Sequence, residues 1–147
     1  MKKFQFRLAA AQKVRDMQLQ LERSKLHELF ARQQQLRNAL EALNQERREA
    51  SALVYEASSV NATDLRALSA FLIGADARVL DLRAQIERQQ QVIQQQKKKV
   101  LDAERAVKLL SKLREKQYQE WNAEFNREIE TIAQESWVGN NFIRNKS

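Results

Sequence analysis

The chain has 147 residues, with 26 lysines and arginines against 19 aspartates and glutamates, and a net charge of +7. It contains no cysteine, one histidine and two isolated glycines, which argues against disulfides, thiolate chemistry, a histidine-based metal site and a glycine-rich phosphate loop. The commonest residues favour helix and no proline interrupts them, so the composition predicts an all-α protein built from long helices or a coiled coil.

The first predicted helix covers about residues 4–57. Apolar residues recur at alternating steps of three and four, the spacing of a coiled-coil seam, which is the row of side chains facing a partner helix. Three seam positions are polar, namely Glu22, Gln33 and Arg47. The others are Leu19, Leu26, Leu29, Leu36, Leu40, Leu43, Ala50, Val54 and Ala57.

A turn is predicted at residues 58–64. Asn61 is a good N-cap, and Asp64 places a carboxylate in the following first turn, where the helix dipole favours negative charge. Thr63 is the alternative cap. Either choice begins the second helix just before Leu65.

The second predicted helix covers about residues 62–136 and repeats the spacing of three and four. Gln89 and Gln96 are its polar seam positions. The others are Leu65, Leu68, Leu72, Ala75, Val79, Leu82, Ile86, Ile93, Val100, Ala103, Val107 and Leu110. The two seams mirror each other about the turn, which predicts one domain over residues 1–136, a long antiparallel two-helix coiled-coil hairpin whose C-terminal helix extends beyond the hairpin.

Pairing the helices outward from the turn fixes a register. Gln33 then faces Gln89, where two amides can satisfy each other, and Arg47 faces Ala75, which leaves the guanidinium room to reach water. A slip by one heptad is the alternative. The layers of the predicted register include Ala57 with Leu65, Leu36 with Ile86 and Leu29 with Ile93.

In this register the stretch from Gln119 to Ser136 has no intramolecular partner and extends roughly 27 Å at about 1.5 Å per residue. Aromatic residues supply many interface hot spots, so we expect this stretch to dock a partner. Folding of Phe4 and Phe6 over Trp121, or self-association, is the alternative. The apolar face of the stretch consists of Trp121, Phe125, Ile129 and Ile132.

Beyond this stretch, Gly139 and the two asparagines after it are typical of a helix stop, so residues 137–147 are expected to form a flexible tail. The sequence has neither a membrane-spanning apolar run nor the apolar stretch of a signal peptide, and a cytoplasmic location is expected. Its carboxylates lie on exposed faces that would not shift their pKa values, so we expect no enzyme activity, no small-molecule substrate and no cofactor.

The positive charge is compatible with an acidic partner. Lysine and arginine are interleaved with acidic residues, which disfavours a basic coiled-coil nucleic-acid binder but leaves it open, with affinity that would fall steeply with salt. A structural spacer is a further alternative.

Three motifs resemble the flagellar FliJ family. The opening Lys3-Phe4-Gln5-Phe6-Arg7-Leu8, followed by Val14-Arg15, resembles the start of its members. Asn61-Ala62-Thr63-Asp64-Leu65 stands where the family has a capped turn. The late stretch resembles the family's C-terminal helix through Leu113-Arg114-Glu115-Lys116, Tyr118, Trp121 and Glu128-Ile129-Glu130-Thr131-Ile132-Ala133.

The resemblance implies a non-catalytic part of the flagellar type III export apparatus, similar to the central stalk of rotary ATPases. Such a protein binds the hexameric export ATPase, FliI, promotes its assembly and activity, links it to the export gate protein FlhA and recycles export chaperones. It would be cytoplasmic and only peripherally associated with the inner-membrane apparatus. The equivalent stalk protein of a virulence secretion system is the alternative.

Two contact sites follow from this role as hypotheses, and neither includes a catalytic or metal-binding residue. The gate contact is placed near the turn, at Leu68, Phe71 and Leu72. The ATPase contact is placed where the paired termini meet, at Phe4, Phe6, Tyr118, Trp121, Phe125, Ile129 and Ile132.

Overall fold

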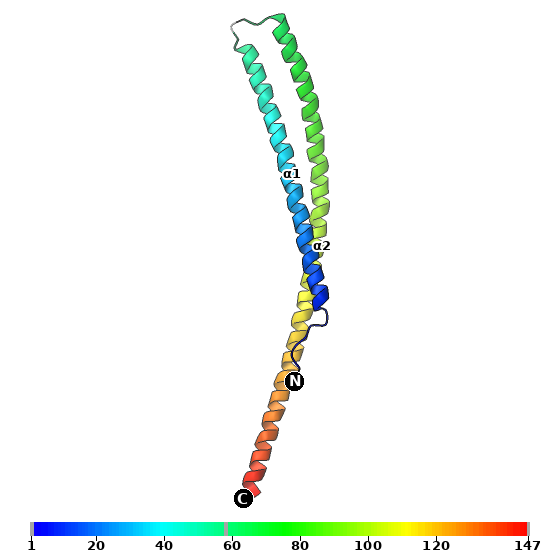
Figure 1. The fold of residues 1–147 in the computed structure, drawn as a ribbon, viewed down its shortest axis with the longest axis vertical. Coiled ribbons are helices and arrows are strands. Elements are labelled where there is room, and N and C mark those ends of the chain that lie inside the picture. The colour runs from blue at the N-terminus through cyan, green and yellow to red at the C-terminus, as the bar shows by residue number, and fades with distance from the viewer. Residues whose placement is uncertain (1, 58, 147) are drawn as a thin grey trace. The chain divides into compact units, whose positions relative to one another are not determined.

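A computed structural model describes residues 2–57 and 59–146, which form two helices, α1 (Ala9–Tyr55) and α2 (Ala62–Lys146). The chain divides into two compact units. We call residues Gln20–Leu101 the turn unit, and the described residues up to Leu19 and from Asp102 the terminal unit. Within the turn unit α1 and α2 run side by side in opposite directions (Figure 1), which confirms the predicted all-α antiparallel hairpin.

The core of the turn unit is the predicted seam. Leu43 packs with Ala75 and Val79, and Leu40 and Leu82 lie against this cluster. These contacts match the predicted layers, because a slip by one heptad would place Leu43 beside other residues of α2. From Glu22 to Val54 on α1 and from Leu68 to Val100 on α2, every predicted seam residue is buried or half-buried. The register is therefore confirmed.

The polar seam residues find partners other than the predicted ones. The Gln33 side-chain amide donates to Gln90 Oε1 at 2.6 Å. The Gln89 side-chain amide donates to the Leu29 carbonyl oxygen at 3.4 Å. The prediction that Gln33 and Gln89 satisfy each other is therefore wrong, although the register that places them in one layer is kept. The physical reason is that a seam side chain of a coiled coil inserts into a hole formed by four residues, which include flanking positions such as Gln90.

Arg47 shows the same effect of a flanking residue. Its guanidinium was expected to reach water past Ala75, and the side chain is 32% exposed. It also pairs with Asp76, the next residue along α2. It also lies within 3.4 Å of Asn44 Oδ1. The carboxylate of Asp76 thus satisfies a charge that the seam alone would leave beside apolar side chains.

The turn places the cap of α2 at Asn61. Asn61 Oδ1 accepts a hydrogen bond of 2.8 Å from the Asp64 backbone N–H, and α2 begins at the next residue, Ala62. This selects Asn61 over Thr63. The predicted first layer is wrong, because α1 ends at Tyr55 and both Ala57 and Leu65 are exposed. The predicted turn residue Ser58 lies outside the described residues.

Replacing Asn61 by alanine is expected to lower the free energy of unfolding by about 1 kcal/mol, because the Asp64 N–H loses its acceptor. Urea denaturation of the full chain, followed by far-ultraviolet circular dichroism, measures the change. Thr63→Ala is the matched control and should change stability by less than about 0.5 kcal/mol. Equal losses in the two variants would contradict the assignment of the cap.

In the terminal unit the first helix begins later than predicted. Residues 2–8 precede α1 and form no helix, so the predicted start at residue 4 is wrong. A helical backbone would turn the side chains of Phe4 and Phe6 to different sides, because residues two apart do not share a helix face. In the observed non-helical segment, Phe6 is buried and Phe4 packs on α2, so both rings are at least partly removed from water.

The second helix ends later than predicted. It continues through Gly139 to Lys146, so the predicted end at residue 136 is wrong, while the flexibility of residues 137–147 stays a prediction. Glycine stops a helix by adopting positive φ, and Gly139 does not do so. Arg144 and Lys146 lie in the last turn, where positive charge interacts favourably with the helix dipole.

Candidate docking site

Aromatic side chains of the terminal unit form one cluster on α2, joined by Phe4 from the N-terminal segment that precedes α1. The ring centroid of Phe4 is 5.2 Å from that of Tyr118 and 6.0 Å from that of Trp121. Trp121 stacks on Tyr118 at 5.9 Å and on Phe125 at 5.3 Å. These distances fall within the range in which aromatic pairs stabilise one another beyond simple burial.

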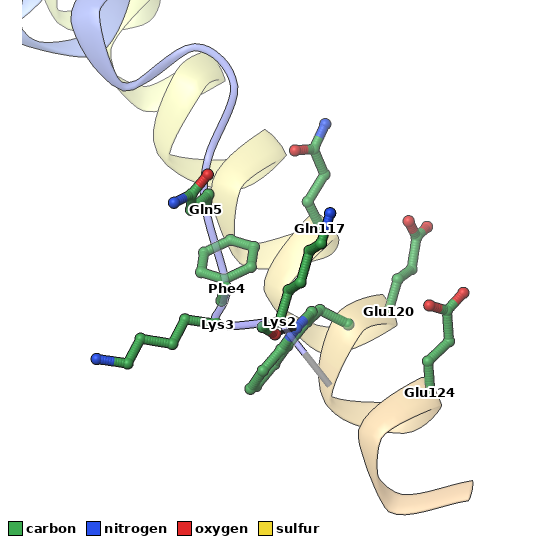
Figure 2. A pocket seen from close by; sticks show the side chains of 8 residues that line it. Lys2, Lys3, Phe4, Gln5, Gln117, Glu120 and Glu124 are labelled. Atoms are coloured by element: carbon green, nitrogen blue, oxygen red, sulfur yellow. Dashed lines mark hydrogen bonds between the residues drawn. The ribbon is translucent and has the colours of Figure 1, made fainter. Parts of the chain in front are cut away.

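Local structure explains how the cluster forms. Tyr118, Trp121 and Phe125 are spaced by three and four residues, which puts them on one face of a helix. The Trp121 indole N–H donates to the backbone carbonyl of Lys2 at 3.1 Å. This hydrogen bond holds the N-terminal segment against α2. Residues 2–8 of that segment are not helical. Figure 2 shows Phe4 lying against α2 at this place.

The structure brings together only part of the predicted ATPase contact. The alternative in which Phe4 covers Trp121 is the observed one, so the helix is not bare from Gln119 onwards as predicted. Phe6 is only 8% exposed and belongs to the core instead of the surface. Ile129 and Ile132 lie further along α2, and their side chains are 47% and 56% exposed.

Sequence reasoning missed further exposed apolar residues. Because the second helix was predicted to end at residue 136, the later residues were not assigned to any helix face. In the structure they continue α2. Four of these residues have large apolar side chains that are at least half exposed. Predicting residues 137–146 as helix would have identified them. They are Trp137, Val138, Phe142 and Ile143.

The predicted gate contact lies in the turn unit and is divided between core and surface. Leu68 is buried and Leu72 half-buried, so both serve the seam. Phe71 is exposed and lines an apolar groove together with Leu53 and Val60. The groove takes residues from both helices and from the turn.

The fold and the exposed surfaces described above indicate a class of protein. The hairpin presents an aromatic cluster, an exposed apolar helix face and an apolar groove near the turn, and such surfaces mark sites of protein–protein interaction. In the described part of the chain, none of the helices has the length and apolar character needed to cross a membrane. The fold and its surfaces are those of a helical scaffold for docking other proteins.

The model of the family described as "Flagellar FliJ protein" matches residues 4–130. The chain therefore belongs to the FliJ family and is a flagellar export-associated protein of a non-enzymatic family. Comparisons with curated proteins and with solved structures gave no significant match. The matched region includes the aromatic cluster and the turn, and it ends before Ile132.

Proposed function

We propose that this chain is a central-stalk-like component of the flagellar export apparatus that binds the hexameric export ATPase, FliI, and promotes its assembly and activity. It works in the cytoplasm, peripherally associated with the inner-membrane apparatus, and links the ATPase to the gate protein FlhA and to export chaperones. Family membership supports the flagellar role over the virulence alternative. The observation that carries the ATPase contact is the aromatic cluster, which passes directly into an exposed apolar face of α2.

The contact surface we propose consists of half-buried rings and exposed aliphatic side chains. Trp121 and Phe125 are both half-buried, so each ring still presents area to a partner. Phe4 and Tyr118 hold Trp121 in place, and Phe6 anchors the N-terminal segment from the core. Rigid aromatic side chains supported in this way lose little conformational entropy on binding, which favours affinity. The exposed aliphatic part of the surface is Ile129 and Ile132.

The test is the rate of ATP hydrolysis and the oligomeric state of the cognate export ATPase with and without this chain. The wild type is expected to raise both, and Trp121→Ala/Phe125→Ala is expected to weaken the effect by at least about tenfold in required concentration, because two hot-spot rings are lost. Phe30→Ala, which removes an exposed ring in the turn unit, should behave as the wild type. An inactive wild type would instead favour a spacer or nucleic-acid binder.

The gate contact is a second part of the proposal and rests on the groove beside Phe71. Phe71→Ala is expected to weaken binding to FlhA by about tenfold, because an exposed ring in an apolar groove is lost. Leu80→Ala, at another exposed position of α2 in the same unit, is the control. Surface plasmon resonance with the purified gate protein measures both. Unchanged binding in Phe71→Ala would remove this contact from the proposal.

A further inference from the structure

Residues 2–5, which we call the strap, lie on α2 outside any helix. The ring of Phe4 packs against Tyr118 and Trp121, and the Lys2 carbonyl oxygen accepts the 3.1 Å hydrogen bond from the Trp121 indole N–H. Figure 2 shows the strap as a non-helical stretch of backbone beside α2. The strap therefore gives Trp121, a central residue of the proposed ATPase contact, both an apolar neighbour and a hydrogen-bond acceptor.

Phe6 fixes the end of the strap that adjoins α1. Its side chain is buried, and its carbonyl oxygen accepts a hydrogen bond of 3.1 Å from the Ala9 backbone N–H at the start of α1. Within the strap, Phe4 is half-buried and the other residues are exposed. The strap is thus anchored in the core at Phe6 and held on Trp121 by contacts that remain partly open to water.

The contacts of the strap are balanced by the order that they require. A half-buried ring and an exposed hydrogen bond each give a modest stabilisation. Fixing the backbone of residues 2–5 carries a loss of conformational entropy of the same order. The closed strap, in which Phe4 lies on Trp121, is therefore in equilibrium with an open strap, and a small change at Trp121 shifts this equilibrium.

Docking of a partner protein on Trp121 makes such a change through the indole N–H. With the strap open, the N–H would bond to water, and a partner that covered the ring would remove this water. A buried N–H without an acceptor costs free energy. With the strap closed, the Lys2 carbonyl already accepts from the N–H, so a partner can cover the ring without this cost.

We infer that the strap is a positioning element whose closure on Trp121 is coupled to docking of a partner protein at that ring. The partner binds the closed form more tightly, and the bound partner in turn holds the strap closed, because the coupling is reciprocal. Phe4 is the side chain that closes the strap, and the Lys2 carbonyl is the acceptor that closure brings to Trp121. The inference rests on the proposed ATPase contact and adds a conformational step that regulates it.

The first experiment follows the strap without a partner. With Trp137→Phe, Trp121 is the single tryptophan of the full chain, so quenching of its fluorescence by acrylamide reports on the strap. Phe4→Ala is expected to raise the quenching constant by about twofold or more, because the open strap is favoured. Phe4→Tyr keeps a ring and should be quenched as the parent protein is. Unchanged quenching in Phe4→Ala would overturn the inference.

The second experiment separates closure of the strap from direct contact between Phe4 and the partner. Gln5 is exposed, and Gln5→Gly and Gln5→Ala both remove its side chain. Glycine gives the open strap more conformational freedom, so Gln5→Gly is expected to bind the cognate export ATPase about threefold more weakly than Gln5→Ala. Phe4→Ala should weaken binding by about tenfold, and Phe4→Tyr should restore it. Equal affinities of Gln5→Gly and Gln5→Ala would overturn the coupling.

The third experiment tests the reciprocal effect. Amide hydrogen exchange of the strap, measured by mass spectrometry on the full chain, is expected to slow by about threefold or more when saturating ATPase is added. Faster exchange would show that the partner displaces the strap, and unchanged exchange would show that docking and closure are independent. Either of these two results would overturn the inference.

The experiments also separate the inference from the proposed function. If the ATPase does not bind the wild type while the variants are quenched as expected, the proposed function fails, and the closure of the strap on Trp121 stands. If the ATPase binds and is stimulated but Phe4→Ala and Gln5→Gly bind as the wild type does, the proposed function stands and the inference is overturned.

Discussion

Replacing Ile93 by alanine is expected to lower the free energy of unfolding by about 3 kcal/mol, the largest loss among single substitutions in the hairpin. Ile93 is only 1% exposed and is the one large side chain, among the described residues, that is fully removed from water. Truncation removes its buried methyl and methylene groups and leaves a cavity, and such losses run from about 2 to 5 kcal/mol in protein cores. The core of a two-helix coiled coil is a narrow row of seam side chains, so few neighbouring side chains can move into the cavity left at Ile93.

The measurement is urea denaturation of the full chain followed by far-ultraviolet circular dichroism. Ile73→Ala is the matched control, because it makes the same chemical change on α2 at a position that is 68% exposed. It should shift the free energy of unfolding by less than about 0.5 kcal/mol. If both variants lost the same amount, burial at Ile93 would not be what stabilises the hairpin.

The second large effect is expected at the polar layer formed by Glu22 and Gln96. Both residues are 7% exposed. The Gln96 amide donates to the Glu22 backbone carbonyl at 3.0 Å and also to the Glu22 carboxylate. Gln96→Leu removes this donor from the buried Glu22 carboxylate, which keeps Lys25 Nζ at 3.9 Å. The loss of the hydrogen bonds is expected to cost about 2 kcal/mol.

A double-mutant cycle tests whether the two residues act as a pair. Glu22→Leu/Gln96→Leu replaces the whole layer by apolar side chains and is expected to be at least as stable as the wild type, since exchanging a buried polar pair for packed leucines is often neutral or stabilising. The coupling between the two substitutions should exceed about 1 kcal/mol. Simple addition of the two single effects would show that the pair does not act as one unit.

The layer also bears on specificity. A seam made only of leucine, isoleucine and alanine tolerates a shift by one heptad, because every layer would remain apolar. Glu22 with Gln96, and Arg47 with Asp76, would each lose its partner in a shifted register. The polar positions thus favour the observed alignment of α1 and α2 within the turn unit over its alternatives.

The sequence by itself determined the helical seam, and it narrowed the register in the turn unit and the cap of α2 to two alternatives each. The structure then selected the unslipped register and Asn61. These features depend on local spacing, because residues three and four apart share a helix face whatever surrounds them, and a cap bonds within its own turn. The same reasoning located the aromatic face of α2, since Trp121 and Phe125 are four residues apart.

Only the tertiary structure decided which side chains meet across the hairpin and how the N-terminal segment is placed. Gln33 bonds Gln90 and Arg47 pairs with Asp76, because long side chains reach flanking positions that a list of seam residues does not contain. The first helix was predicted from residue 4, but residues 2–8 precede α1. Their position outside α1 depends on the contact of Phe4 with Trp121, more than a hundred residues away in the sequence, and only the folded hairpin brings that ring within reach.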